Sequence, residues 1–197
     1  GENRKVGAEK CVSQADEIPC RMCIIRQIIA ILRMQKSAFM NSSAPGNPGM
    51  PHLNFPPVRL RARRRGDAVE IWDGLRGIYL VLTPEEWVRQ HLIAYLVSAC
   101  GVLAKRIVEE HAVALNGQPQ RADVVVVGDH GEPLLLAECK APDVPITERT
   151  LAQAMRYNSV LGARWIVLTN GLRHFCWEHR DGRYAQLPGF PDLSVDL

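Results

Sequence analysis

The chain contains 197 residues, a length typical of one domain or of one domain with an appendage. Hydrophobic residues make up 47% of the chain and charged residues 23%, which excludes a chain that is disordered as a whole. The longest apolar run, residues 22–34, is interrupted by Arg26 and Arg33. It falls short of the roughly 18 residues that a membrane-spanning helix needs, so we expect no membrane partner.

The net charge is +3, and its distribution matters more than its size. Residues 1–49 hold seven of the 24 lysines and arginines and four of the 21 acidic residues, which leaves 17 of each in residues 50–197. Because the main body is neutral, its bulk charge gives no reason to expect a polyanionic partner. Binding to nucleic acid would have to come from local sites.

Residues 1–49 have little of the character of a folded domain. They offer one short amphipathic stretch, residues 24–34, and then a linker rich in Ser, Pro, Gly and Asn at residues 42–49. We expect a poorly structured or non-native N-terminal extension, with Met50 as the natural start. The alternative is an interaction helix that docks on the body or on a partner.

The six cysteines indicate the redox compartment. Three of them lie in apolar stretches, at positions 100, 139 and 176, where cysteine behaves as a small buried hydrophobe. The others, at 11, 20 and 23, form at most half of a zinc site, because no second ligand pair follows at suitable spacing. The pattern therefore predicts a reduced, cytoplasmic protein without a disulfide framework.

The first elements of the body are strands, expected at residues 58–64, 67–72 and 77–83. A helix should follow, since Thr83 is a favourable N-cap residue and Pro84 suits the first helical position. Apolar residues then recur at helical spacing, and we expect this helix to end near Gly101. A helical or strand-like piece should run on to about residue 115.

Two short apolar strands follow, at residues 122–127 and 134–140, joined by a loop at 128–133. Because both strands are apolar on both faces, this hairpin should lie at the centre of a sheet covered by helices. The remaining elements are a helix at residues 147–161 and strands at 165–169, 173–180 and 184–187. The sequence thus predicts an α/β fold with a central mixed β-sheet of five or more strands flanked by helices.

The register of the central hairpin brings two carboxylates together. If residues 128–133 form the loop, Val127 faces Leu134, and Asp123 then faces Glu138 on one side of the sheet. Facing carboxylates destabilise each other. They need a compensating cation in a buried position.

Two kinds of cation can compensate for this pair. Lys140 shares the face of Glu138, and Arg121 is expected opposite Lys140. A divalent ion that bridges both carboxylates would compensate more effectively, and Mg²⁺ is typically bound by one or two carboxylates with water and phosphate.

Polar residues on the flanking helices point to the same place. Gln153 and Tyr157 are four residues apart and share one helix face. Glu85 is in phase with the apolar positions of the first helix and is expected to lean into the site, with Glu86 as the alternative if that helix is rotated. Glutamates also stabilise any helix N-terminus, so this pair has a purely structural explanation as well.

Five arginines within seven residues form a possible contact for phosphates. They are Arg59, Arg61, Arg63, Arg64 and Arg65. On a strand, the four odd-numbered residues share one face, which would suit DNA binding. The alternative is a solvated edge strand that its charges protect from aggregation. The four tryptophans, at positions 72, 87, 165 and 177, are expected in the core.

The order of these motifs resembles the PD-(D/E)xK nuclease superfamily, and residues 50–180 are more closely similar to the N-terminal nuclease domain of type I restriction enzyme R subunits. The matching stretches are Leu82–Gln90, Arg121–Asp123, Ala137–Pro142, Gln153–Asn158 and Leu168–Gly171. The sequence departs from the pattern at Ala122, where a proline is usual. It also lacks a Walker-type nucleotide-binding motif, so no helicase or ATPase motor is expected in this chain.

The resemblance implies a nuclease-like PD-(D/E)xK domain at residues 50–197 that hydrolyses DNA phosphodiester bonds with Mg²⁺ or Mn²⁺. It makes Asp123 and Glu138 metal ligands, and it has Lys140 hold or activate the attacking water. By the same likeness, Glu85 is an accessory group, and Gln153 and Tyr157 support the site. The implied partners are DNA and other restriction-system subunits.

Two other functions remain open at this stage. One is a catalytically silent DNA- or protein-binding module of a restriction system. The other is an interaction protein whose charged cluster is only structural, in which Asp123 pairs with Lys140 and Glu138 with Arg121.

Overall fold

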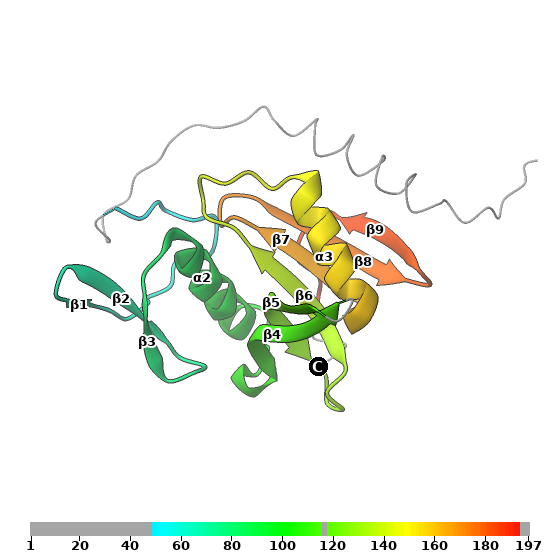
Figure 1. The fold of residues 1–197 in the computed structure, drawn as a ribbon, viewed down its shortest axis with the longest axis horizontal. Coiled ribbons are helices and arrows are strands. Elements are labelled where there is room, and N and C mark those ends of the chain that lie inside the picture. Colours follow the sequence, from blue (N-terminus) through cyan, green and yellow to red (C-terminus); the bar gives the residue numbers. More distant parts are fainter. Residues whose placement is uncertain (1–48, 116–117, 194–197) are drawn as a thin grey trace, which may run out of the picture.

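A computed structural model of the chain describes residues 49–115 and 118–193 (Figure 1). The expected extension lies outside the described residues except for Gly49, and so does the alternative interaction helix. Within the described ranges, no helix has the length and apolar character required to cross a membrane.

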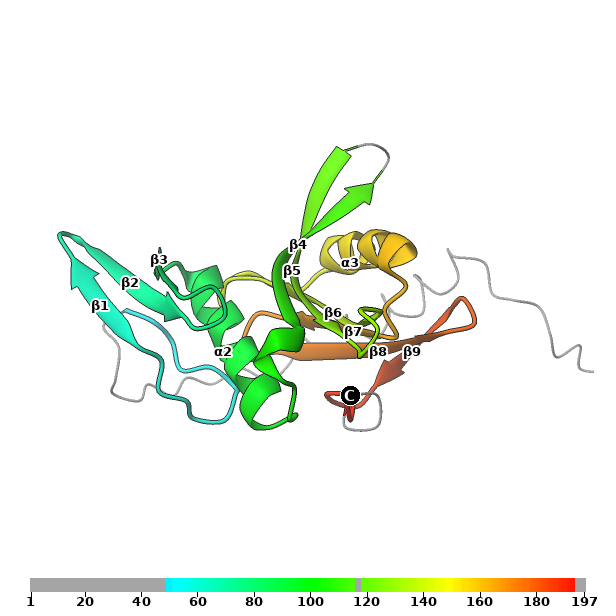
Figure 2. The ribbon, with the colours of Figure 1, turned by 90° about the horizontal axis from the view of Figure 1, so that it is seen from below.

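The chain begins its ordered part with a small antiparallel sheet. Its strands are β1 (Ala62–Arg65), β2 (Ala68–Asp73) and β3 (Ile78–Val81), in the order β1-β2-β3. The three predicted strands are therefore confirmed, with shorter first and third members. Figures 1 and 2 show this sheet at one end of the molecule, on the far side of helix α2 from the larger sheet.

Helix α2 (Pro84–Ser98) starts where the sequence predicts. The Thr83 side chain caps it by accepting a hydrogen bond from the Glu86 N–H at 3.1 Å, and Pro84 occupies the first helical position. The helix ends three residues before Gly101. A short 3-10 turn, η1 (Ala104–Arg106), then leads into β4 (Ile107–Leu115).

The larger sheet has six strands in the order β4-β5-β6-β7-β8-β9. The remaining elements are β5 (Gln118–Val127), β6 (Pro133–Cys139), α3 (Glu148–Leu161), β7 (Trp165–Thr169), β8 (His174–Arg180) and β9 (Arg183–Leu187). Strands β6 and β7 are parallel and are connected through α3, whereas the other neighbours are antiparallel. The predicted α/β fold with a mixed sheet between helices is confirmed.

Two apolar layers hold the helices on the two faces of this sheet. On one face, Val88 and Leu92 of α2 pack in a cluster with Val124 of β5. On the other, Leu151 of α3 packs with Leu136 of β6. The central position of β5 and β6 follows from their apolar residues on both faces, as expected.

The predicted location of the tryptophans in the core is only half correct. Trp165 and Trp177 are buried, with 7% and 0% of their surface exposed. Trp72 and Trp87 are only half-buried. Trp72 lies on β2, and its surroundings are described below.

The register of the central hairpin agrees with the prediction at three pairs and departs from it at both ends. Val124 faces Ala137, and the next two residues of β5 follow the same register. The expected pair of Val127 with Leu134 is wrong, because the register shifts after Val126 and Val127 faces Pro133. A proline cannot donate a hydrogen bond to a neighbouring strand, so it favours such an irregularity.

Candidate active site

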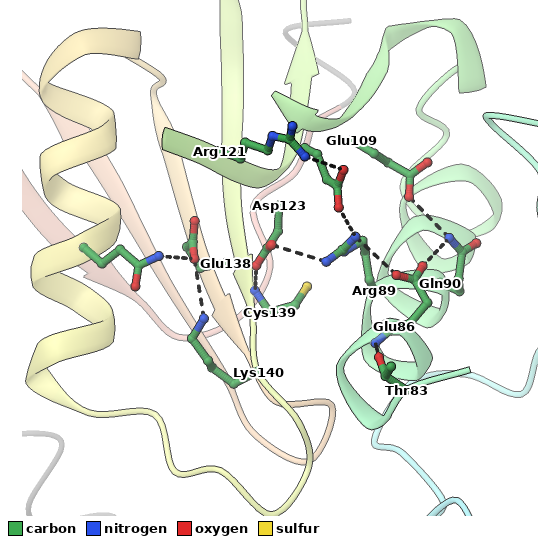
Figure 3. Close-up of polar contacts among 12 residues, drawn as sticks. Thr83, Glu86, Arg89, Gln90, Glu109, Arg121, Asp123, Glu138, Cys139 and Lys140 are labelled. Atoms are coloured by element: carbon green, nitrogen blue, oxygen red, sulfur yellow. Dashed lines mark hydrogen bonds and ion pairs between the residues drawn. The ribbon is translucent and has the colours of Figure 1, made fainter. Parts of the chain in front are cut away.

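Asp123 and Glu138 lie one residue beyond the last pair between β5 and β6, which is Val124 with Ala137. Figure 3 shows their side chains next to each other, with Lys140 beside Glu138 and Arg89 on the other side of Asp123. Glu138 is 1% exposed and the Asp123 side chain 15%. The hairpin therefore brings two largely buried carboxylates together.

The two oxygens of Glu138 have different surroundings. Its Oε2 atom accepts a hydrogen bond from Gln153 Nε2 at 3.0 Å and lies 3.7 Å from Lys140 Nζ. Its Oε1 atom is buried and has no hydrogen-bond partner among the described residues. Burial raises the pKa of Glu138 to about 8, and the negative charge of Asp123 adds to this effect. The positive charge of Lys140 lowers that pKa, but by less than burial raises it.

Asp123 is oriented by the backbone of the neighbouring strand. Its Oδ2 atom accepts a hydrogen bond from the Cys139 N–H at 2.7 Å, and its Oδ1 atom lies 3.5 Å from Arg89 Nη2. In a continued ladder, the Cys139 N–H would point to a backbone carbonyl of β5. Because the Asp123 carboxylate accepts it instead, the pairing of the two strands ends at this point.

The position of Lys140 is set by the turn after β7. The Lys140 N–H donates to the Thr169 carbonyl at 2.9 Å, and the Asn170 side chain donates to the Val144 carbonyl at 2.9 Å. These contacts hold Lys140 and Val144 in the segment that follows β6. The stretch 168–171 thus supports the site from a distance. The expected contact of Arg121 with Lys140 is not formed, because the β5–β6 ladder ends before it.

The structure brings both predicted α3 residues to the site. Gln153 Nε2 donates to Glu138 and also to the Tyr157 hydroxyl, at 3.2 Å. The Tyr157 hydroxyl in turn donates to Gln120 Oε1 at 3.4 Å. Gln153 therefore touches a carboxylate directly, and Tyr157 holds Gln153 from behind.

The two glutamates at the start of α2 have different surroundings. Burial raises the pKa of Glu85, the charge of Lys140 lowers it and the charge of Asp123 raises it again, so Glu85 lies within the field of the site. Glu86 is buried and binds Gln90 Nε2 at 2.9 Å. It also lies 3.2 Å from Arg89, which links it to the site indirectly.

Arg89 is a site residue that the sequence analysis did not single out. It is 7% exposed, and its guanidinium contacts three carboxylates, from Glu86, Glu110 and Asp123, at 3.2, 3.4 and 3.5 Å. Its Nε atom is buried without a hydrogen-bond partner in the described part of the chain. Its spacing from Glu85, four residues along the helix, was the available signal.

Glu110 has a strained backbone opposite Asp123. Its φ of 48° falls in the left-handed region, which costs a non-glycine residue about 1–3 kcal/mol. The β4–β5 ladder is interrupted there, between the pairs Glu109–Val124 and His111–Ala122. The strained residue directs its carboxylate toward three cations, which are Arg76, Arg89 and Arg121.

A second buried carboxyl pair lies behind the site. Burial raises the pKa of Glu109 to about 8. A hydrogen bond that the protonated Glu109 carboxyl donates to Asp73, and the negative charge of Asp73, add to the effect. Arg76 lies 3.2 Å from Asp73 and 3.4 Å from Glu109. This cluster anchors the three-stranded sheet to β4.

The purely structural pairing considered from the sequence is wrong in both of its parts. Lys140 contacts Glu138, and Asp123 contacts Arg89. Arg121 contacts Glu110 at 3.4 Å.

The chemistry of the donor set fits a small divalent cation bound by two carboxylates. No cluster of three or more His, Cys, Asp or Glu side chains in residues 49–115 and 118–193 is arranged to hold a metal ion. Mg²⁺, however, usually keeps several waters and needs only one or two carboxylates from the protein. The unpartnered Oε1 of Glu138, beside the charge of Asp123, offers an oxygen ligand without another use.

Comparison with known proteins gives the family of the chain. The model of the family described as type I restriction enzyme R protein N terminus matches residues 84–191, more than half of the sequence. This chain belongs to that family. A search of curated proteins found no match.

The match to the R protein N terminus begins at α2. It includes all six strands of the larger sheet, together with every residue of the charged cluster from Glu85 to Tyr157. The three-stranded sheet precedes the matched range. The resemblance to the N terminus of type I restriction enzyme R subunits, inferred from the sequence motifs, is thereby confirmed.

The raised pKa of Glu138 predicts a specific pH dependence of stability in the metal-free protein. Between its ordinary pKa of 4.5 and about 8, the unfolded chain releases this proton while the folded chain keeps it. The free energy of unfolding should therefore fall with rising pH in this window. Glu138→Gln should remove that decrease and be more stable than the natural chain at pH 8.5 by on the order of 1–3 kcal/mol, with no gap at pH 4.5.

Urea denaturation across this pH range, with a chelator present, measures the gap. The exposed Asp143 serves as a control, because Asp143→Asn removes a carboxylate without changing the buried pair. Parallel pH curves for Glu138→Gln and the natural chain would contradict the burial of an uncompensated carboxylate.

Proposed function

We propose that this protein is a DNA endonuclease domain of a restriction system, built on a PD-(D/E)xK core and dependent on Mg²⁺ or Mn²⁺. The single observation that carries the proposal is the convergence of Asp123, Glu138 and Lys140 at one end of the central hairpin. Membership of the R protein N-terminal family supports the role in restriction. It also supports DNA and other subunits of a restriction enzyme as partners.

The carboxylates of Asp123 and Glu138 would hold the metal, with Glu85 as an accessory group. A bound divalent ion polarises the phosphoryl oxygen and lowers the pKa of a coordinated water. The protein contributes orientation. The Cys139 N–H fixes one oxygen of Asp123, and the Gln153 amide fixes one oxygen of Glu138.

Lys140 would add positive charge at the reacting phosphate. Its ammonium group lies 3.7 Å from Glu138 and its side chain is 23% exposed, so it can reach a substrate while the carboxylate holds it. The phosphate gains negative charge in the transition state, and a fixed cation stabilises that charge more than it stabilises the ground state. The same ammonium group can hold the attacking water.

One observation favours the catalytically silent binding module as a second candidate. The Arg89 guanidinium lies 3.5 Å from Asp123 and compensates its charge without any metal. In such a module, Arg89 and Lys140 would be the permanent counter-ions of the two carboxylates. We also propose a cytoplasmic location, in keeping with the free cysteines at positions 100, 139 and 176.

Plasmid cleavage distinguishes the two candidates. In Mg²⁺ or Mn²⁺, the natural chain should convert supercoiled plasmid to nicked or linear forms. Asp123→Asn and Lys140→Ala should each lower the rate by about 100-fold or more, because each removes a fixed charge from the reacting centre. Asp143→Asn is the matched control and should cleave normally. Equal cleavage by all four proteins would identify a contaminating nuclease and contradict the proposal.

The contacts of Arg89 predict opposite effects on metal affinity from two neighbouring substitutions. Arg89→Met removes a cation that competes for Asp123, so Mn²⁺ should bind more tightly. Glu110→Gln leaves Arg89 with one carboxylate fewer and strengthens its hold on Asp123, so Mn²⁺ should bind more weakly. We expect each change to be about fivefold, or about 1 kcal/mol.

Isothermal titration with Mn²⁺ measures both affinities without requiring cleavage. A general loss of folding would weaken binding in both variants, so shifts of the same sign would contradict the competition between Arg89 and the metal.

A further inference from the structure

The outer face of the three-stranded sheet gathers arginines over aromatic rings. The register places Arg63 opposite Glu70, and it places Trp72 opposite Tyr79. Side chains two residues apart along a strand share a face, so all four belong to one side of the sheet. The opposite side contains Ile71, which is completely buried.

Arg63 is held in place from two directions. Its guanidinium lies 3.7 Å from the centroid of the Tyr79 ring, and its Nε atom donates to Glu70 Oε2 at 2.6 Å. The Arg63 side chain is nevertheless 46% exposed. Because the ring covers one surface and the carboxylate takes the Nε edge, the two terminal nitrogens remain available to a ligand from solvent.

A second arginine is supported by an aromatic ring and by its backbone. The Arg61 carbonyl accepts a hydrogen bond from the Trp72 N–H at 2.8 Å, and the Arg61 guanidinium lies 5.6 Å from the centroid of the Trp72 ring. Trp72 and Tyr79 pack edge to face, with their ring centroids 5.0 Å apart. Each ring therefore supports one guanidinium group, and the contact between the rings fixes their relative position.

The face keeps a net positive charge although it includes the carboxylate of Glu70. Glu70 is 10% exposed at its side chain and accepts Arg63 on one oxygen, while Arg65 lies 3.6 Å from the other. Arg65 is still 76% exposed. The carboxylate therefore lies beneath the arginines and orients them.

The structure narrows the set of five arginines predicted to bind DNA. Arg61, Arg63 and Arg65 share the face with the aromatic rings. Arg64 faces Val69 in the ladder and so lies on the opposite side of the sheet. Arg59 is exposed but precedes β1.

We propose that this face is a docking surface for the phosphodiester backbone of DNA, on which Arg61, Arg63 and Arg65 bind successive phosphates of one strand. The inference rests on the proposed action on DNA, but the surface lies outside the matched family range. Alternate residues of a β-strand are about 6.6 Å apart, which is comparable with the separation of neighbouring phosphates. Guanidinium groups bind phosphate oxygens through paired N–H groups.

The location of the face suits DNA that flanks the reacting bond. Figures 1 and 2 show the sheet separated from β6 by α2. The Arg76 contacts to Asp73 and Glu109 fix the sheet to the core, so a duplex bound there keeps a defined orientation to the site. Protection of an exposed edge strand needs only charge. The Arg63 guanidinium, which is stacked on Tyr79 and hydrogen-bonded to Glu70, is better explained by a ligand of fixed geometry.

Fluorescence anisotropy with a short labelled duplex and the full chain, in a chelator so that no cleavage occurs, tests this surface. The double variant Arg61→Ala/Arg63→Ala should reduce the slope of log Kd against log salt by about 1.8, which is about 0.9 for each phosphate that the protein no longer neutralises. Arg183→Ala, an exposed arginine on β9, is the matched control and should leave the slope unchanged.

Two variants that keep the charge separate an ordered surface from a merely basic one. Tyr79→Leu removes the ring that holds the Arg63 guanidinium and should weaken DNA binding about two- to tenfold. The reason is that the entropy cost of ordering the arginine side chain then falls on the binding step. Tyr79→Phe keeps the ring and should bind like the natural chain. Arg63→Lys keeps the charge but not the stacking, and it should weaken binding as well.

Each outcome decides one question. An equal slope change for the double variant and Arg183→Ala would overturn the docking surface, as would unchanged binding by both Tyr79→Leu and Arg63→Lys. Displacement of the duplex by polyglutamate at an equal concentration of charge would assign the face to an acidic protein instead. Weakened binding by the arginine variants together with a natural chain that cleaves no plasmid would sustain the surface and reject the nuclease proposal.

Discussion

The candidate site is built around two largely buried carboxylates on neighbouring strands, and the residues around them are arranged to compensate their charge. The burial of Glu138 and the charge of Asp123 both disfavour the ionised form of Glu138, and together they raise its pKa. The chain answers with one cation on each flank, Lys140 beside Glu138 and Arg89 beside Asp123. Even so, one oxygen of Glu138 stays buried without a hydrogen bond among the described residues. This burial of carboxylates with incomplete compensation supports the proposal of a bound cation.

The backbone around the pair is organised to keep it in place. The β5–β6 ladder ends where the Asp123 carboxylate accepts the hydrogen bond of the Cys139 N–H. On the other edge of β5, the β4–β5 ladder is interrupted at the strained residue Glu110. Both irregularities are next to the same aspartate. Strain of this kind persists only where the surrounding structure enforces it, and here it directs Glu110 toward Arg89. The positive charge of Arg89 is therefore shared between Asp123, a candidate metal ligand, and the carboxylates of Glu86 and Glu110.

Most of the fold could be predicted from the sequence, and so could the two carboxylates, the lysine and the α3 residues of the candidate site. Alternating and continuous apolar patterns, with the Thr83 cap, were enough for the strands and helices, because these signals are local. The proximity of Asp123 and Glu138 followed from the same patterns. The shift at Val127 and the end of the ladder could not be predicted, since they depend on Pro133 and on a side chain that replaces a backbone acceptor.

The role of Arg89 was hidden for a different reason. Its partners come from α2, β4 and β5, and residues 107–115 could be assigned equally to helix or strand. Without the position of β4, neither Glu110 nor the buried pair behind it could be placed. The arginines of β1 showed the opposite case, because their number was plain in the sequence. Their use became clear only when the register put Trp72 and Tyr79 beneath them.

Joint binding of a divalent cation by Asp123 and Glu138 underlies the proposed chemistry. Crystals of the protein soaked in Mn²⁺ would reveal it through the anomalous scattering of the metal. We predict one strong peak between the two carboxylates, at about 2.0–2.2 Å from an oxygen of each, with Arg89 moved away from Asp123. Saturating Mn²⁺ with no peak at this position, and with the ion pair between Arg89 and Asp123 intact, would refute joint binding.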